Sequence, residues 1–170
     1  MIHKTLQFTS DILNQYLKNK FELEEEKVVL NNIVQYDGSV QVMNENKVVI
    51  SLINIEKETA SPFYSGPGEG GNYSDDAPNE MHNLDILITV NFNDYSEGLK
   101  FLDAAMAFFQ LNPFFDTANA TNIPRDIIKI EFGLLKTDYQ QMQNLWKAMA
   151  ASYRPSVIYK IRQVAATQTN

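Results

Sequence analysis

The clearest structural pattern in the chain is the stretch Leu84-Asp85-Ile86-Leu87-Ile88-Thr89-Val90-Asn91-Phe92. Every second residue from Leu84 to Phe92 is apolar, and most of the residues between them are polar. Alternation with a period of two is typical of a β-strand that turns one face toward a core. The stretch therefore predicts a strand, and the patterns on either side of it indicate what kind of sheet it joins.

Downstream of this strand, helical and extended patterns alternate. The predicted elements are a helix at 96–111, a strand at 127–135, a helix that begins at Asp138, and a final strand with Val157, Tyr159 and Ile161 on one face. Ser96 and Asp138 are candidate N-caps, whereas Pro113 and Pro155 end the two helices. The order strand–helix–strand–helix–strand is typical of a sheet with helices packed on one side.

Upstream of the strand, three further elements are predicted. Residues 2–20 form an apolar helical stripe, and residues 27–36 are β-rich and precede Asp37-Gly38, a strong hairpin signal. Residues 47–56 are apolar on both faces, which is typical of a central strand covered on both sides. The fold class expected is α+β: one domain over residues 1–170, with a mixed or antiparallel sheet and helices packed on it.

Residues 57–82 interrupt these patterns. They hold four of the seven glycines and three of the six prolines. A loop longer than ~12–15 residues is uncommon in a compact domain and is usually functional or disordered. We therefore expect a long acidic loop here, and a frayed polar tail at residues 165–170.

The composition excludes several classes of protein. The chain has no cysteine, which rules out disulfides, thiol catalysis, cysteine-ligated zinc and iron–sulfur clusters. Its net charge of −7 argues against a nucleic-acid partner. No apolar run approaches the ~20 residues of a membrane helix, so no membrane insertion is expected. No signal-peptide pattern follows Met1, which predicts synthesis in the cytoplasm without a cleaved signal.

The charge is distributed unevenly along the chain. Residues 57–82 contain one lysine and five acids, whereas residues 154–170 contain three basic residues and no acid. Opposite local charges can steer like subunits together, although ordinary solvated surface also explains them. The candidate interaction residues are Phe63, Tyr73, Asp75, Asp76, Arg154, Lys160 and Arg162.

No motif in the chain predicts catalysis. The two histidines, His3 and His82, lack a second ligand at helical spacing, and no Gly-x-Ser-x-Gly elbow occurs. The glycine-rich segment 66–71 contains Glu69, which would repel phosphate. The acids near His82 could gather a metal, but a flexible acidic loop explains them more simply. We expect no enzyme activity, no metal and no cofactor.

Three stretches together resemble a known family. They are residues 49–56, residues 83–113, and residues 145–161, the last containing Trp146 and the run Tyr153-Arg154-Pro155-Ser156. The resemblance is to the cap, or tail-tube terminator, family of contractile injection systems. These are phage-tail-like particles of the virulence-cassette and antifeeding-prophage types, and the likeness covers nearly the whole chain.

The resemblance implies a structural protein assembled into such a particle. It implies a homo-hexameric ring that caps the inner tube and contacts the inner tube protein and the sheath or sheath-terminator protein. Longer members of the family carry additional sequence after this domain, so a minimal terminator, or a ring elsewhere in the particle, is also consistent with it. Two other hypotheses stay open from the residues alone: a module that binds a protein or glycan through the 57–82 loop, and a hydrolase with an acidic site of unknown type.

Overall fold

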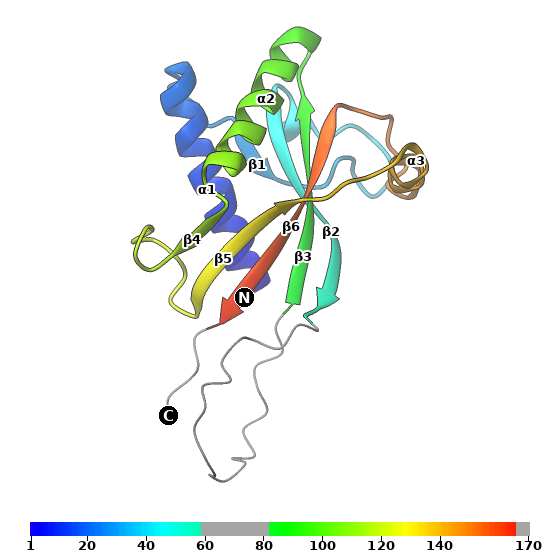
Figure 1. The fold of residues 1–170 in the computed structure, drawn as a ribbon. Coiled ribbons are helices and arrows are strands. Elements are labelled where there is room, and N and C mark those ends of the chain that lie inside the picture. The colour runs from blue at the N-terminus through cyan, green and yellow to red at the C-terminus, as the bar shows by residue number, and fades with distance from the viewer. Residues whose placement is uncertain (59–81, 166–170) are drawn as a thin grey trace, which may run out of the picture.

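The structure, a computed structural model, describes residues 1–58 and 82–165 (Figure 1). Within these residues, three α-helices and one six-stranded sheet of order β1-β2-β3-β6-β5-β4 make up the fold. The elements are α1 (Ile2–Phe21), β1 (Val28–Leu30), the short 3₁₀ helix η1 (Val42–Asn44), β2 (Lys47–Lys57), β3 (His82–Asn91), α2 (Tyr95–Leu111), β4 (Phe114–Asp116), β5 (Ile127–Leu134), α3 (Tyr139–Ala148) and β6 (Ser156–Ala165). The sheet is mixed, because β1 pairs with β2 in parallel and all other pairs are antiparallel. The predicted α+β class is therefore confirmed.

Strand β3 forms where its sequence pattern predicted a strand, and it lies inside the sheet. It pairs along its length with β2 on one side and with β6 on the other. The alternating pattern predicted a single buried face, but every residue from Asn83 to Val90 is buried. Ile86 and Ile88 belong to the large core, whereas Leu87 belongs to a second cluster on the opposite face. Both faces of this strand are therefore covered.

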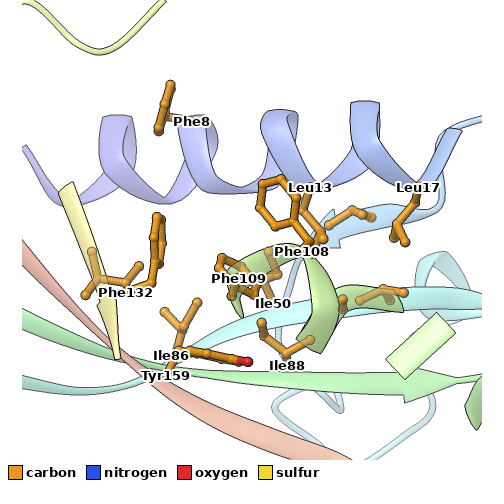
Figure 2. Close-up of a cluster of buried hydrophobic side chains, with 14 of the residues drawn as sticks. Phe8, Leu13, Leu17, Ile50, Ile86, Ile88, Phe108, Phe109, Phe132 and Tyr159 are labelled. Carbon is orange, nitrogen blue, oxygen red and sulfur yellow. The ribbon is translucent and has the colours of Figure 1, made fainter. Parts of the chain in front are cut away.

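The large core lies between one face of the sheet and helices α1 and α2 (Figure 1). Figure 2 shows Phe8, Leu13 and Leu17 along α1, with Phe108 and Phe109 of α2 between them and the strands. The strand side of this core is Ile50, Ile86, Ile88, Phe132 and Tyr159. The Phe109 ring lies 4.6 Å from Tyr159 and 4.8 Å from Phe132, between ring centroids. Burial of apolar area on this scale is the main term that stabilises such a fold.

Helix α3 packs on the other face of the sheet, so the prediction of helices on one side only was wrong. Its Trp146 is 4% exposed and contacts a cluster built on Leu87 and Ile158. These two residues lie on the face opposite the large core, because neighbouring residues of a strand point to opposite faces. The predicted cap of this helix is confirmed. Asp138 and Gln141 form a reciprocal capping box, with the Gln141 N–H donating to Asp138 Oδ1 at 2.8 Å.

The end of α2 at Leu111 is as predicted, but its N-cap and the strand that follows it are not. Helix α2 begins at Tyr95, and its N-cap is Asp94 and not Ser96, since Asp94 Oδ1 accepts from the Glu97 N–H at 2.8 Å. After Pro113 the chain enters the three-residue strand β4, which the sequence pattern did not predict. A strand this short lacks the alternation needed to identify it.

The segment between α1 and β2 differs most from expectation. Only Val28–Leu30 form a strand, and β1 runs parallel to β2, so Asp37-Gly38 does not connect two paired strands. The turn exists, with Gly38 at φ 82°, but it closes a small loop through a single bridge between Val34 and Val40. Parallel neighbours need a longer connection than a hairpin. Asn44, which is buried, holds that connection by donating to the carbonyl of Asn32 at 2.8 Å.

Strand β2 is covered on both faces only in its first half. Val48, Val49 and Ile50 are buried, but Leu52 is 37% exposed and Ile55 is 47% exposed. The reason is that β1 ends opposite Ile50. The second half of β2, after the irregularity in its register, has no other described strand on its outer side. The strand therefore begins as a central strand and ends as an edge strand.

Candidate assembly surfaces

Four of the seven predicted interaction residues, Phe63, Tyr73, Asp75 and Asp76, lie outside the described residues. The expected loop at 57–82 is bounded by a strand pair, because Lys57 of β2 lies opposite His82 of β3. The other three predicted residues are described. Lys160 and Arg162 belong to β6, and Arg154 precedes it.

Lys160 is held within the chain and not displayed for a partner. Its Nζ pairs with Glu56 and lies 3.6 Å from Asp85 Oδ1. Asp85 is 7% exposed, lies opposite Lys160 in the sheet register, and also accepts from Asn54 Nδ2 at 3.0 Å. The hydrogen bond to Glu56, with the charge of Asp85 beside it, raises the pKa of Lys160.

Arg162 is also paired with acids of neighbouring strands. Its Nε donates to Glu58 Oε2 at 3.0 Å, and its guanidinium lies 3.7 Å from Glu131 of β5. With the Lys160 pairs these contacts form a charged ladder across β2, β3, β6 and β5. Surface pairs of this kind contribute ~0–1 kcal/mol each. The ladder compensates most of the positive charge that made the C-terminal segment stand out in the sequence.

Arg154 is the exception among the three. It is half-buried just before β6 and forms no ion pair with any described residue. Arg154 therefore differs from Lys160 and Arg162, whose charges are paired with acids of the described residues.

A second surface, which sequence reasoning missed, carries much of the exposed apolar area. We define the arm surface as the exposed apolar side chains of the β1–β2 connection: Tyr36, Val40, Val42 and Met43. Tyr36 is fully exposed, and Val40, Val42 and Met43 are each about 70% exposed. Exposed apolar side chains gathered in this way mark sites of interaction with other proteins.

Two open grooves meet at Tyr36. One is lined by Tyr36, Leu52 and Ile53 together with Leu145 and Met149 at α3. The other is lined by Tyr36, Val42 and Met43. Tyr36 therefore lies between a groove that reaches α3 and a groove that reaches η1.

A sequence signal for this surface existed in the charge pattern. Residues 31–43 contain one charged residue, Asp37, and residues 48–55 contain none, whereas 21% of the whole chain is charged. The hairpin interpretation of Asp37-Gly38 assigned the flanking apolar residues to paired strands. The structure places them in solvent instead.

A third surface lies at the opposite edge of the sheet. We define the β4 surface as the exposed apolar residues Leu111, Phe114 and Ile128. Phe114 is 40% exposed, and Lys129 Nζ lies over its ring, 4.7 Å from the centroid. The order β1-β2-β3-β6-β5-β4 separates this surface from the arm surface by the width of the sheet (Figure 1).

The described residues contain no site with evident chemistry. Residues 1–58 and 82–165 hold no group of three or more metal-ligating side chains, and none of their helices is long and apolar enough to cross a membrane. The acids that precede His82 in the sequence, Asp75, Asp76 and Glu80, all lie outside these ranges. The features that remain among the described residues are the charged ladder and the exposed apolar side chains.

Two comparisons with known proteins identify the fold and the family of the chain. Among solved structures, the fold is similar to that of the PVC sheath/tube terminator of an extracellular contractile injection system, determined by cryo-electron microscopy in the extended state. The TM-score is 0.58 at 13% sequence identity, over 99% of this chain and 57% of that one. A model of the Pvc16 N-terminal domain matches residues 6–170, so the chain belongs to that family. No curated protein matches the chain. The resemblance inferred from the sequence is confirmed.

Proposed function

We propose that this chain is a structural, non-enzymatic subunit that terminates the inner tube of a contractile, phage-tail-like injection particle. The observation that carries the proposal is the family match over residues 6–170. The similarity of its fold to that of a sheath/tube terminator supports it. In this role the chain forms a homo-hexameric ring that contacts the inner tube protein and the sheath end. The ring is part of an assembled particle.

The described surfaces suit such a role. Apolar side chains are exposed at both edges of one rigid sheet, which is the arrangement a subunit needs to contact neighbours on two sides. Arg154 and the loop residues Phe63, Tyr73, Asp75 and Asp76 are the candidates for contacts with tube or sheath. Lys160 and Arg162 act in these contacts only if a partner competes with the acids of the charged ladder.

Tube length in particles made without the chain tests the proposal. Particles are produced from a gene cluster that lacks this protein and from the same cluster with the protein restored, and the tubes are measured by electron microscopy. A terminator predicts tubes of irregular length in its absence and a single narrow length distribution after restoration. Unchanged tube lengths in its absence would contradict the proposal.

A further inference from the structure

We propose that neighbouring copies of this chain pack head to tail, with the arm surface of one copy against the β4 surface of the next. The inference rests on the proposed ring and adds which surfaces make the contact between subunits. A ring repeats one contact between two different surfaces of each copy, because only a heterologous contact can continue around an axis. The two apolar surfaces at opposite edges of this sheet meet that requirement (Figure 1).

The arm surface is held in place before any partner arrives. The Gln35 N–H donates to the Ser39 carbonyl at 2.9 Å, and the Ser39 N–H donates to Asp37 Oδ1 at 2.9 Å. These bonds fix the backbone of the turn that carries Tyr36, so little backbone entropy is lost when a partner covers it. A rigid aromatic side chain at a preorganised turn is a typical anchor of a protein interface.

The composition of the arm surface favours a partner that is always present. Residues 31–43 contribute one charge, and the adjoining residues 48–55 contribute none. Charged residues are depleted in the cores of permanent interfaces, whereas transient partners are commonly steered by charge. A second copy of the same chain fits this pattern, since it is made wherever the first copy is made.

The β4 surface complements the arm surface in charge as well as in apolarity. Arg125, three residues before Ile128 in the sequence, is exposed and forms no ion pair with a described residue. The one charge on the arm turn is Asp37, whose pKa is lowered by hydrogen bonds from Ser39. An ionised Asp37 against Arg125 would set the register of the two apolar surfaces.

The contact is made through side chains and not by extending the sheet past β4. Asn119 Oδ1 accepts from the Asp116 N–H at 2.8 Å, and Asn119 Nδ2 donates to the Phe114 carbonyl at 3.3 Å. These bonds occupy the outward backbone groups of β4, so no strand of a neighbour can pair there. The competing arrangement is a two-fold dimer in which two copies join through the arm surface and the open second half of β2.

Engineered cysteines distinguish these arrangements, because the natural chain has none. Met43→Cys labels the arm surface and Ile128→Cys labels the β4 surface. We expect a mixture of the two variants, mildly oxidised, to form the mixed disulfide at least tenfold faster than either variant forms its own dimer. A chain carrying both cysteines should give a ladder of covalent oligomers that ends at the ring. Tyr95→Cys, on the 69% exposed first residue of α2, replaces Met43→Cys in the control mixture.

The outcomes separate the interface from the proposed function. Equal rates in the mixture and in the control mixture, or faster dimerisation of Met43→Cys alone, overturn the head-to-tail contact. If this happens while the reduced variants still restore uniform tube length, the terminator role stands without the proposed contact. If the mixed disulfide forms as expected but the wild-type chain does not restore tube length, the contact stands and the role is wrong.

A charge introduced at the centre of the arm surface gives an independent test. Val42→Asp should lower the equilibrium population of the ring at least tenfold, because an acid would be buried opposite apolar residues. Tyr95→Asp is the matched control, and an acid at the start of a helix is tolerated there. Both variants are first checked for an unchanged thermal melt. Equal ring populations for the two variants would overturn the assignment of the arm surface.

Discussion

At the scale of single residues, the apolar core contains a few buried polar atoms that have no hydrogen-bond partner among the described residues. Trp146 is the clearest case, because its ring is 4% exposed and its Nε1 finds no hydrogen-bond acceptor among the described residues. A buried N–H without an acceptor costs about 1–3 kcal/mol. The apolar contacts of the ring with the cluster around Leu87 and Ile158 must exceed that cost for α3 to remain docked.

Substitution of Trp146 therefore separates packing from hydrogen bonding. Trp146→Ala should lower the free energy of unfolding by about 3–5 kcal/mol, as expected for truncation of a buried aromatic residue. Trp146→Phe should lose clearly less, because it keeps a ring in the cluster and removes the unpaired N–H. Urea denaturation followed by circular dichroism measures both. A Trp146→Ala variant that unfolds like the parent but fails to assemble would show that Trp146 acts at an interface.

Tyr159 makes a prediction for alkaline pH. Burial in the large core raises the pKa of its hydroxyl above the ordinary value of 10.0. Above pH 10 the unfolded chain ionises this group before the folded chain does, so the stability conferred by a neutral Tyr159 is lost as pH rises further. The raised pKa of Lys160 acts in the same direction, because its stabilising charge is also lost at high pH.

The measurement is the thermal midpoint between pH 8 and pH 11. Tyr159→Phe cannot ionise and should show a smaller alkaline decrease of the midpoint than the parent. Tyr153→Phe, at a residue that is 64% exposed, should keep the decrease of the parent. Identical pH profiles for the parent and Tyr159→Phe would refute the assignment.

At the scale of elements, the sheet protects its two edges differently. Asn119 occupies the backbone of β4, whereas the second half of β2 has no described strand beside it. Removing Asn119 should therefore expose backbone groups of β4 to pairing. Natural sheets block such edges because open ones promote aggregation.

Asn119→Ala tests this role. We expect a loss of about 1–3 kcal/mol of stability, from two hydrogen bonds to the backbone at ~0.5–1.5 kcal/mol each. We also expect faster aggregation on mild heating. Asn122→Ala, in the same exposed connection, is the matched control. Light scattering and thermal melts that do not distinguish the two variants would contradict the blocking role.

How well the sequence predicted each element depended on the length of its pattern. The strand at Leu84, the stripe of α1 and the capped helix after Asp138 were predicted correctly, because several residues repeat one period in each. Strand β4 and the parallel pairing of β1 were missed, since three residues carry no period and pairing direction is set by tertiary contacts. The side of the sheet covered by α3 was also mispredicted, although the unbroken apolar run Ile86-Leu87-Ile88 indicated two buried faces.

The connection from β2 to β3 yields a prediction about the predicted loop. The register pairs Lys57 with His82, so the described strands bring the two ends of the connection together. Replacing residues 61–80 with a short Gly/Ser linker should leave the melting midpoint within a few degrees of the parent, because loop-closure entropy changes by only ~0.6 kcal/mol per halving of length. We expect the same variant to dock poorly onto a partner ring. A large loss of stability would contradict the expectation for the melting midpoint. Uniform tube length restored by this variant would contradict the expectation for docking.

At the scale of the whole molecule, sequence reasoning and structure identify different candidate sites. Net charge along the chain pointed to Lys160 and Arg162, but cross-strand acids that are distant in sequence pair with both. No sequence motif indicates the arm surface. Its only signal in the sequence is the low number of charged residues in that segment. Side-chain exposure depends on where neighbouring elements end, as β1 does opposite Ile50, and a local pattern does not contain that information.

The most direct test of the terminator account is the position of the chain in the particle. Particles are assembled with this protein carrying a C-terminal affinity tag, labelled with gold, and imaged by electron microscopy. The account predicts label at one end of the inner tube, with averaged images that show a closed ring there. Label distributed along the tube or sheath, or particles of normal length that carry no label, would contradict it.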